Sequence, residues 1–95
     1  MILDVGQMLR DLGTDAAILE PREFLDAAIA GVAYRSGMQS VLVYDYDDLV
    51  LAFMRMHDWS SEVASEWVDS NVVGTYLGLG TPIILDSLVG RGQNE

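Results

Sequence analysis

The apolar residues of this chain change their spacing halfway along it, and that change limits the fold more than any other feature. Residues 41–44 read Val-Leu-Val-Tyr, a run of β-branched and bulky side chains that favours a strand over residues 40–46. From residue 47 onward the spacing is helical, with apolar residues at Leu49, Val50, Phe53 and Met54. The sequence therefore predicts a strand followed at once by a helix over residues 47–56.

Acidic and hydroxyl residues mark where helices begin. Asp45 is a suitable N-cap for the helix over 47–56, and Asp47 and Asp48 in its first turn favour the helix dipole. Ser60 is a suitable cap for a second helix over 61–77 that ends at Gly78. The inner side of this second helix carries Val63, Ala64, Trp67, Val68, Asn71 and Val72. We expect Trp67 to pack in the core opposite Phe53, and Asn71 to bond a buried backbone group.

The segment before the central strand has two interpretations. Phe24, Ala28 and Val32 are spaced by four, which together with Pro21 favours a helix that ends near residues 36–37. Alternatively, residues 27–34 form a strand, and Ser36-Gly37 is the turn of a hairpin. We favour the hairpin because the strand over 40–46 needs a neighbour.

The complete reading is a single α+β domain over residues 1–95. A small antiparallel sheet, made of the hairpin and a C-terminal strand over 82–85, is covered by two or three helices. Pro82 lacks an N–H donor, so its strand should begin there or lie at a sheet edge. We also expect an N-terminal helix over 1–13, a connector over 14–23, an α+β core over 24–86 and a flexible tail over 87–95.

Composition excludes several functions. Fifteen acidic residues against five basic ones give a net charge of −10, which would repel nucleic acid phosphates. The chain has no cysteine and one histidine, so thiol catalysis, disulfides and sites built from several imidazoles are excluded. The longest uncharged run, residues 70–85, is too short and too rich in glycine for a membrane span, and residues 1–12 are too charged for a signal peptide. We expect a soluble protein that stays in the cytoplasm.

Carboxylates are concentrated in the middle of the chain. Between residues 45 and 69 the only cation is Arg55. Glu62, Glu66 and Asp69 are spaced to share one helical face, where like charges repel one another. This acidic face either binds a basic partner or is simply solvated. The candidate binding residues are Asp45, Asp47, Asp48, Asp58, Trp59, Glu62, Glu66 and Asp69.

Trp59 itself has two interpretations. Between Asp58 and Ser60, it is either the anchor of a protein interface or an aromatic cover over the junction of two helices.

Candidate catalytic and cofactor motifs do not fit their chemistry. The segment from Asp45 lacks the glycine and the twelfth-position carboxylate of a calcium loop. His57, Asp58 and Ser60 are neighbours on one tight loop, which disfavours a converging triad. The glycines at 78 and 80 follow a helix and have no nearby cation, unlike a phosphate loop. We therefore predict no catalytic residue, no metal and no cofactor.

Four motifs resemble a family of small, largely uncharacterised phage and prophage proteins. They are Tyr44-Asp45-Tyr46-Asp47, Glu66-Trp67, the run Asn71-Val72-Val73-Gly74-Thr75-Tyr76-Leu77-Gly78, and Thr81-Pro82. The likeness covers residues 24–85. It implies a non-enzymatic, anti-CRISPR-like inhibitor that binds a basic host defence protein of CRISPR or restriction type in the host cytoplasm. The alternative is a small structural or oligomerising phage module, since 51% hydrophobic residues in a short chain favour a homodimer.

Overall fold

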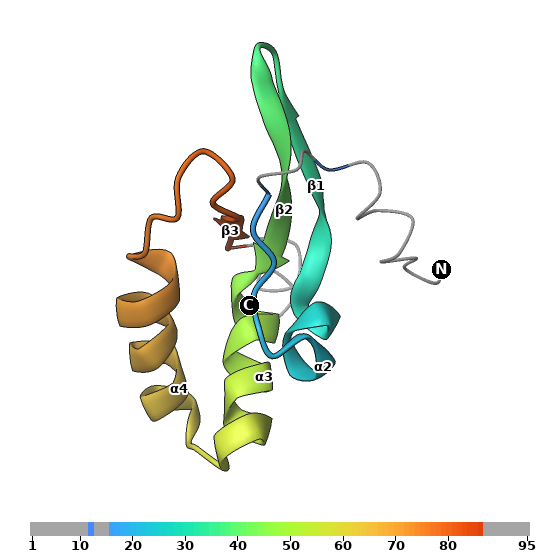
Figure 1. Cartoon of the computed structure of the whole chain (residues 1–95). Coiled ribbons are helices and arrows are strands. Elements are labelled where there is room, and N and C mark those ends of the chain that lie inside the picture. Colours follow the sequence, from blue (N-terminus) through green and yellow to red (C-terminus); the bar gives the residue numbers. More distant parts are fainter. Residues whose placement is uncertain (1–11, 13–15, 87–95) are drawn as a thin grey trace, which may run out of the picture.

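The computed structural model describes residue 12 and residues 16–86, and these residues form an α+β fold (Figure 1). In chain order the elements are the helix α2 (Arg22–Leu25), the 3-10 turn η1 (Asp26–Ala28), the strands β1 (Ile29–Arg35) and β2 (Met38–Asp45), the helices α3 (Tyr46–His57) and α4 (Ser61–Val68), the π-helical turn η2 (Asp69–Val73) and the strand β3 (Ile83–Leu85). The expected N-terminal helix and C-terminal tail lie outside the described residues.

Of the two interpretations of the segment before β2, the hairpin is confirmed and the helix over residues 24–34 is wrong. β1 pairs antiparallel with β2, and Val32 lies opposite Leu42. Gly37 has a φ of 79°, which a residue with a side chain rarely adopts, so the predicted turn depends on this glycine. The strand begins at Ile29 rather than at residue 27, because α2 and η1 occupy residues 22–28. The expected connector is therefore helical at its end.

The third strand runs in the direction opposite to the one expected. β3 lies at the edge of the sheet next to β2, but the two strands are parallel, and Val43 is the partner of Ile83. The sheet is therefore mixed rather than antiparallel. Figure 1 shows the reason: α3 continues the course of β2, α4 returns, and the loop after η2 climbs beside the hairpin before β3 descends. Parallel neighbours need such a crossover.

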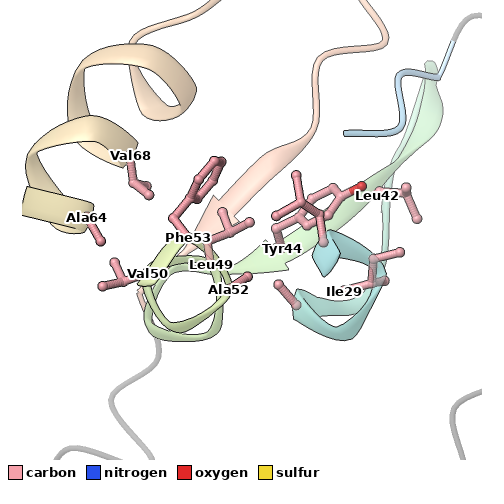
Figure 2. Close-up of a cluster of buried hydrophobic side chains, with 11 residues drawn as sticks. Ile29, Leu42, Tyr44, Leu49, Val50, Ala52, Phe53, Ala64 and Val68 are labelled. Atoms are coloured by element: carbon pink, nitrogen blue, oxygen red, sulfur yellow. The ribbon is translucent and has the colours of Figure 1, made fainter. Parts of the chain in front are cut away.

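One face of the sheet packs on the helices and forms the core (Figure 2). Leu42 and Tyr44 of β2, Leu49 of α3 and Val68 of α4 are fully buried, together with Leu25 of α2. Burial of large apolar side chains is the main source of stability in a domain of this size.

The expectation that Trp67 lies in the core was wrong, because its side chain is 42% exposed. The buried residues of α4 are Ala64 and Val68, which lie one turn apart. Trp67 lies beside them on the helix and contacts Phe53 across a ring distance of 6.5 Å.

The caps of α3 and α4 are those predicted, but α4 is shorter than expected. Asp45 accepts a hydrogen bond from the Asp48 N–H at 2.9 Å, and Ser60 Oγ accepts one from the Val63 N–H at 3.3 Å. After Val68 the helix widens into η2 and ends before Gly74, not at residue 77.

Polar side chains accompany this early end. Asn71 Nδ2 donates to the Trp67 carbonyl at 3.1 Å, and Thr75 Oγ1 donates to the Asn71 carbonyl at 2.7 Å. Asn71 thus bonds a backbone group, but an exposed one rather than the buried one expected. Such local bonds compete with regular helical bonding.

The segment before α2 is held on the sheet by two hydrogen bonds. The Ala17 N–H donates to the Gly80 carbonyl at 2.9 Å, and the Leu19 N–H donates to the buried Tyr44 hydroxyl at 2.9 Å. Burial raises the pKa of Tyr44, and the hydrogen bond from the Leu19 N–H, which favours the charged form, partly offsets this rise. The segment is therefore tied to both β2 and the loop before β3.

Candidate protein-interaction surface

The tight connection between α3 and α4 places a tryptophan at the end of the helical hairpin. Asp58 adopts the left-handed conformation with a φ of 57°, which aspartate tolerates better than most residues. The N–H groups of Asp58 and Trp59 both donate to the Met54 carbonyl, which closes the end of α3. This turn directs the Trp59 side chain back onto the two helices.

Four aromatic rings meet at this end of the molecule. His57 stacks on Trp59 with a centroid distance of 4.2 Å and on Phe53 at 6.2 Å. Trp67 contacts Trp59 at 5.7 Å and Phe53 at 6.5 Å, both in tilted arrangements. Three of these distances lie within the range of about 4.5–7 Å in which aromatic pairs stabilise one another, and the 4.2 Å stack of His57 on Trp59 is closer still. Trp59 thus covers the junction of the helices, as one of its two interpretations expected.

The outer side of these rings forms a shallow groove. It is lined by Trp59, Val63, Glu66, Trp67, Ser70 and Asn71, and is called the aromatic groove below. Val63 and Trp67 are exposed by 45% and 42%, so apolar surface faces solvent here. Singly exposed apolar residues are ordinary, but two adjacent ones beside a half-buried tryptophan form a continuous patch.

The acidic residues are distributed over both ends of the helical hairpin rather than on one face. Glu66 lines the groove, and Asp58 and Glu62 at the loop end are the chain neighbours of the groove residues Trp59 and Val63. Asp45, Asp47 and Asp48 lie at the opposite end of α3. Since α3 has 12 residues, its two ends are about 18 Å apart. The structure therefore brings three of the candidate carboxylates near the groove and separates three others from it.

The carboxylates at the start of α3 have local roles. Asp45 caps the helix. Burial and the neighbouring Asp45 and Asp47 raise the pKa of Asp48, an effect that Arg55 partly offsets. Three carboxylates thus lie close together at the start of α3, and one of them, that of Asp45, accepts the capping hydrogen bond.

Asp69 faces a different hollow from Glu66, although helical spacing suggested a shared face. Its Oδ1 accepts a hydrogen bond from the Tyr46 hydroxyl at 2.8 Å, which ties η2 to the start of α3. Burial raises the pKa of Tyr46, and so do the hydrogen bond to Asp69 and the negative charges of Asp69 and Asp86. Tyr46, Asp69 and Asp86 line this second hollow with Val73 and Ile84. Asp86 could not be predicted from sequence spacing, because it reaches this hollow through the crossover to β3.

Positive charge lies elsewhere in the described part of the chain. Its three arginines are Arg22, which pairs with Asp26 at 3.0 Å, Arg35 in the hairpin and Arg55, whose charge acts on Asp48. None of the three lines the aromatic groove. In the described part of the chain, no arginine therefore lies in the aromatic groove to neutralise the carboxylate there.

A third hollow, which the sequence analysis did not anticipate, lies on the sheet near the hairpin tip. It is lined largely by apolar groups, including Tyr34, Met38, Val41, Leu79 and Ile83. Tyr34 and Leu79 are exposed by 74% and 70%. Gln39 also lines it, and its buried Nε2 has no hydrogen-bond partner. Only the pairing of β3 with β2 assembles this surface.

Residue 12 and residues 16–86 contain neither a metal-binding cluster nor a membrane-spanning helix. No group of three or more histidine or acidic side chains there is arranged to hold a metal ion. Within the same residues, no helix combines the length and the apolar character that crossing a bilayer requires.

Comparisons with models of protein families, with curated proteins and with solved structures each gave no significant match. The resemblance to small phage proteins therefore stays a prediction.

Proposed function

We propose that this chain is a non-enzymatic binding module that engages a basic protein through the aromatic groove and the carboxylates around it. The observation that supports this most is the position of Trp59 and Trp67. Both line one groove, in contact with each other at 5.7 Å, beside Glu66 and without an arginine of the described chain.

Protein interfaces typically have this composition. Their centres are enriched in tryptophan and other aromatic residues, while charged groups lie at the rim. Here the exposed Asp58 and Glu62 directly precede the groove residues Trp59 and Val63 in the chain, and the indoles supply apolar area in the groove. The rim carboxylates would accelerate association with a basic partner by electrostatic steering.

The identity of the partner rests on the sequence resemblance. A small phage protein of this kind would bind a basic host defence protein, of CRISPR or restriction type, and occupy the channel that normally holds nucleic acid. Its action would be that of an inhibitor in the host cytoplasm, without direct contact with nucleic acid and without catalysis. The carboxylates would take the place of phosphates, and this is compatible with the net charge of −10.

The test compares two variants of equal charge. Glu62→Gln/Glu66→Gln and Glu20→Gln/Glu23→Gln each change the net charge from −10 to −8 and replace exposed residues. Glu23 belongs to α2 and Glu20 precedes it by two residues, and α2 lies on the side of α3 away from α4 (Figure 1). The probe is a labelled peptide in which arginine and lysine alternate with serine, titrated at low salt and at about 0.15 M, where screening acts beyond about 8 Å.

We expect the first variant to bind about tenfold more weakly than the parent, or about 1.4 kcal/mol, and the control to change little. Equal weakening of both variants would show attraction by net charge alone and would contradict a localised site.

A second candidate function is that of an oligomerising module. The hollow near the hairpin tip supports it, because an unpartnered buried amide nitrogen and exposed apolar side chains meet there. A second copy could cover this surface and supply the missing acceptor. Sedimentation over a range of concentrations would test it: Leu79→Asp should abolish a dimer, while Tyr76→Asp, equally exposed but outside the hollow, should leave it intact.

A further inference from the structure

The aromatic groove has the elements needed to hold one particular side chain. Trp67 is partly exposed and tilted by 54° relative to Trp59, so the two indole planes meet at an angle within a single groove. An indole face attracts a cation, most strongly when the cation is flat enough to stack on it.

Hydrogen-bond acceptors lie beside these rings. Glu66 lines the groove with a carboxylate. Asn71 also lines it, and since its Nδ2 already donates to the Trp67 carbonyl, its Oδ1 is the atom that it offers to a donor. The groove therefore combines aromatic faces with oxygen acceptors on the same wall of the molecule.

From this combination we propose that the aromatic groove binds an arginine side chain of the basic partner, in preference to lysine. The inference rests on the proposed function, which requires a basic partner but not a particular cation. A guanidinium is planar and weakly hydrated, and its donors form a fork that matches a carboxylate. It can stack on an indole while donating to Glu66 and Asn71. The lysine ammonium is compact and strongly hydrated, and it uses only part of such a site.

The groove is also suited to direct measurement. The chain contains two tryptophans, and both line the groove. Intrinsic fluorescence therefore reports on the groove itself, and a ligand bound elsewhere on the acidic surface would leave the emission nearly unchanged.

The experiment uses two peptides of equal length and charge, one of alternating arginine and serine and one of alternating lysine and serine. At about 0.15 M salt we expect the arginine peptide to bind the parent protein about fivefold more tightly and to change the tryptophan emission. Trp67→Leu should bring the two affinities to within about twofold. Glu66→Gln should weaken the arginine peptide more than the lysine peptide. Glu20→Gln serves as the control and should preserve the preference.

Circular dichroism and thermal unfolding establish that each variant is folded. Should Trp67→Leu fail to fold, the exposed Glu66→Gln still decides the question, since Glu66 has no part in the core.

Two outcomes overturn the inference in distinguishable ways. If both peptides bind the parent equally, and Glu62→Gln/Glu66→Gln weakens both, arginine recognition is wrong while the proposed basic partner remains supported. If Glu62→Gln/Glu66→Gln weakens the binding of both peptides no more than Glu20→Gln/Glu23→Gln does, the proposed function is wrong as well.

Discussion

Replacing Tyr44 by phenylalanine would test how the segment before α2 is held on the sheet. The Tyr44 side chain is fully buried, and its hydroxyl accepts the Leu19 N–H at 2.9 Å. Phenylalanine keeps the ring and its packing against the core, so the change removes little besides the oxygen. The nearby bond from the Ala17 N–H to the Gly80 carbonyl is untouched by the substitution itself.

The magnitude follows from what the Leu19 N–H loses. A hydrogen bond between uncharged groups contributes about 0.5–1.5 kcal/mol net, and a fully buried donor left unpaired costs about 1–3 kcal/mol. Leu19 is only partly buried, so water can reach part of this segment. We therefore expect a loss of about 1–1.5 kcal/mol. Truncation of the same side chain to alanine would remove the ring as well and cost about 3–5 kcal/mol.

Two measurements check this expectation. Amide hydrogen exchange should show Leu19 exchanging about tenfold faster in Tyr44→Phe, since 1.4 kcal/mol corresponds to a factor of ten. The melting temperature should fall by about 4–8 °C for each kcal/mol lost from the free energy of unfolding. Tyr34→Phe is the control, because that ring is 74% exposed and its change should stay within about 0.5 kcal/mol. Unchanged protection of the Leu19 amide would refute the reasoning.

Three further predictions concern the turn, the start of α3 and the aromatic rings. Gly37→Ala should destabilise the fold by about 1–2 kcal/mol, because Gly37 has a φ of 79°, whereas Gly31→Ala, at a position with open space and no positive φ, should change little in urea unfolding. Asp48 has a raised pKa, so its ionised form is disfavoured in the folded state; Asp48→Asn should raise the melting temperature at pH 7, and the gain should vanish as the pH falls below about 4. Phe53→Ala should cost about 3–5 kcal/mol in denaturant unfolding, clearly more than Trp67→Ala, because Phe53 is buried and Trp67 is 42% exposed; equal costs would contradict the placement of the two rings.

Features determined by neighbouring residues were predictable from the sequence. The hairpin turn at Gly37 and the caps Asp45 and Ser60 depend on a few adjacent residues, and each was found where it was expected. The strand and helix on either side of Asp45 follow from a change in apolar spacing that local reasoning can detect.

Features that depend on the path of the chain were not predictable. The parallel direction of β3 is set by the long return through α3, α4 and the following loop. The exposure of Trp67 depends on how wide a side of α4 faces the core. That side is occupied by Ala64 and Val68 alone, so Trp67 lies beside it. Helical spacing likewise placed Asp69 beside Glu66, but its bond to Tyr46 across the hairpin assigns it to another hollow. Periodicity identifies an apolar side without fixing how much of it is covered.

The junction between β2 and α3 contains no linking residue, because Asp45 is both the last residue of the strand and the cap of the helix. No loop lies at this point to accommodate an inserted residue. It would turn α3 by about 100° and advance it by about 1.5 Å relative to the sheet. Leu49 and Phe53 would then rotate away from the core, and α4 with its tryptophans would be carried along. Because β2 and α3 share Asp45, the orientation of β2 fixes that of α3 and, through α4, the direction in which the aromatic groove faces.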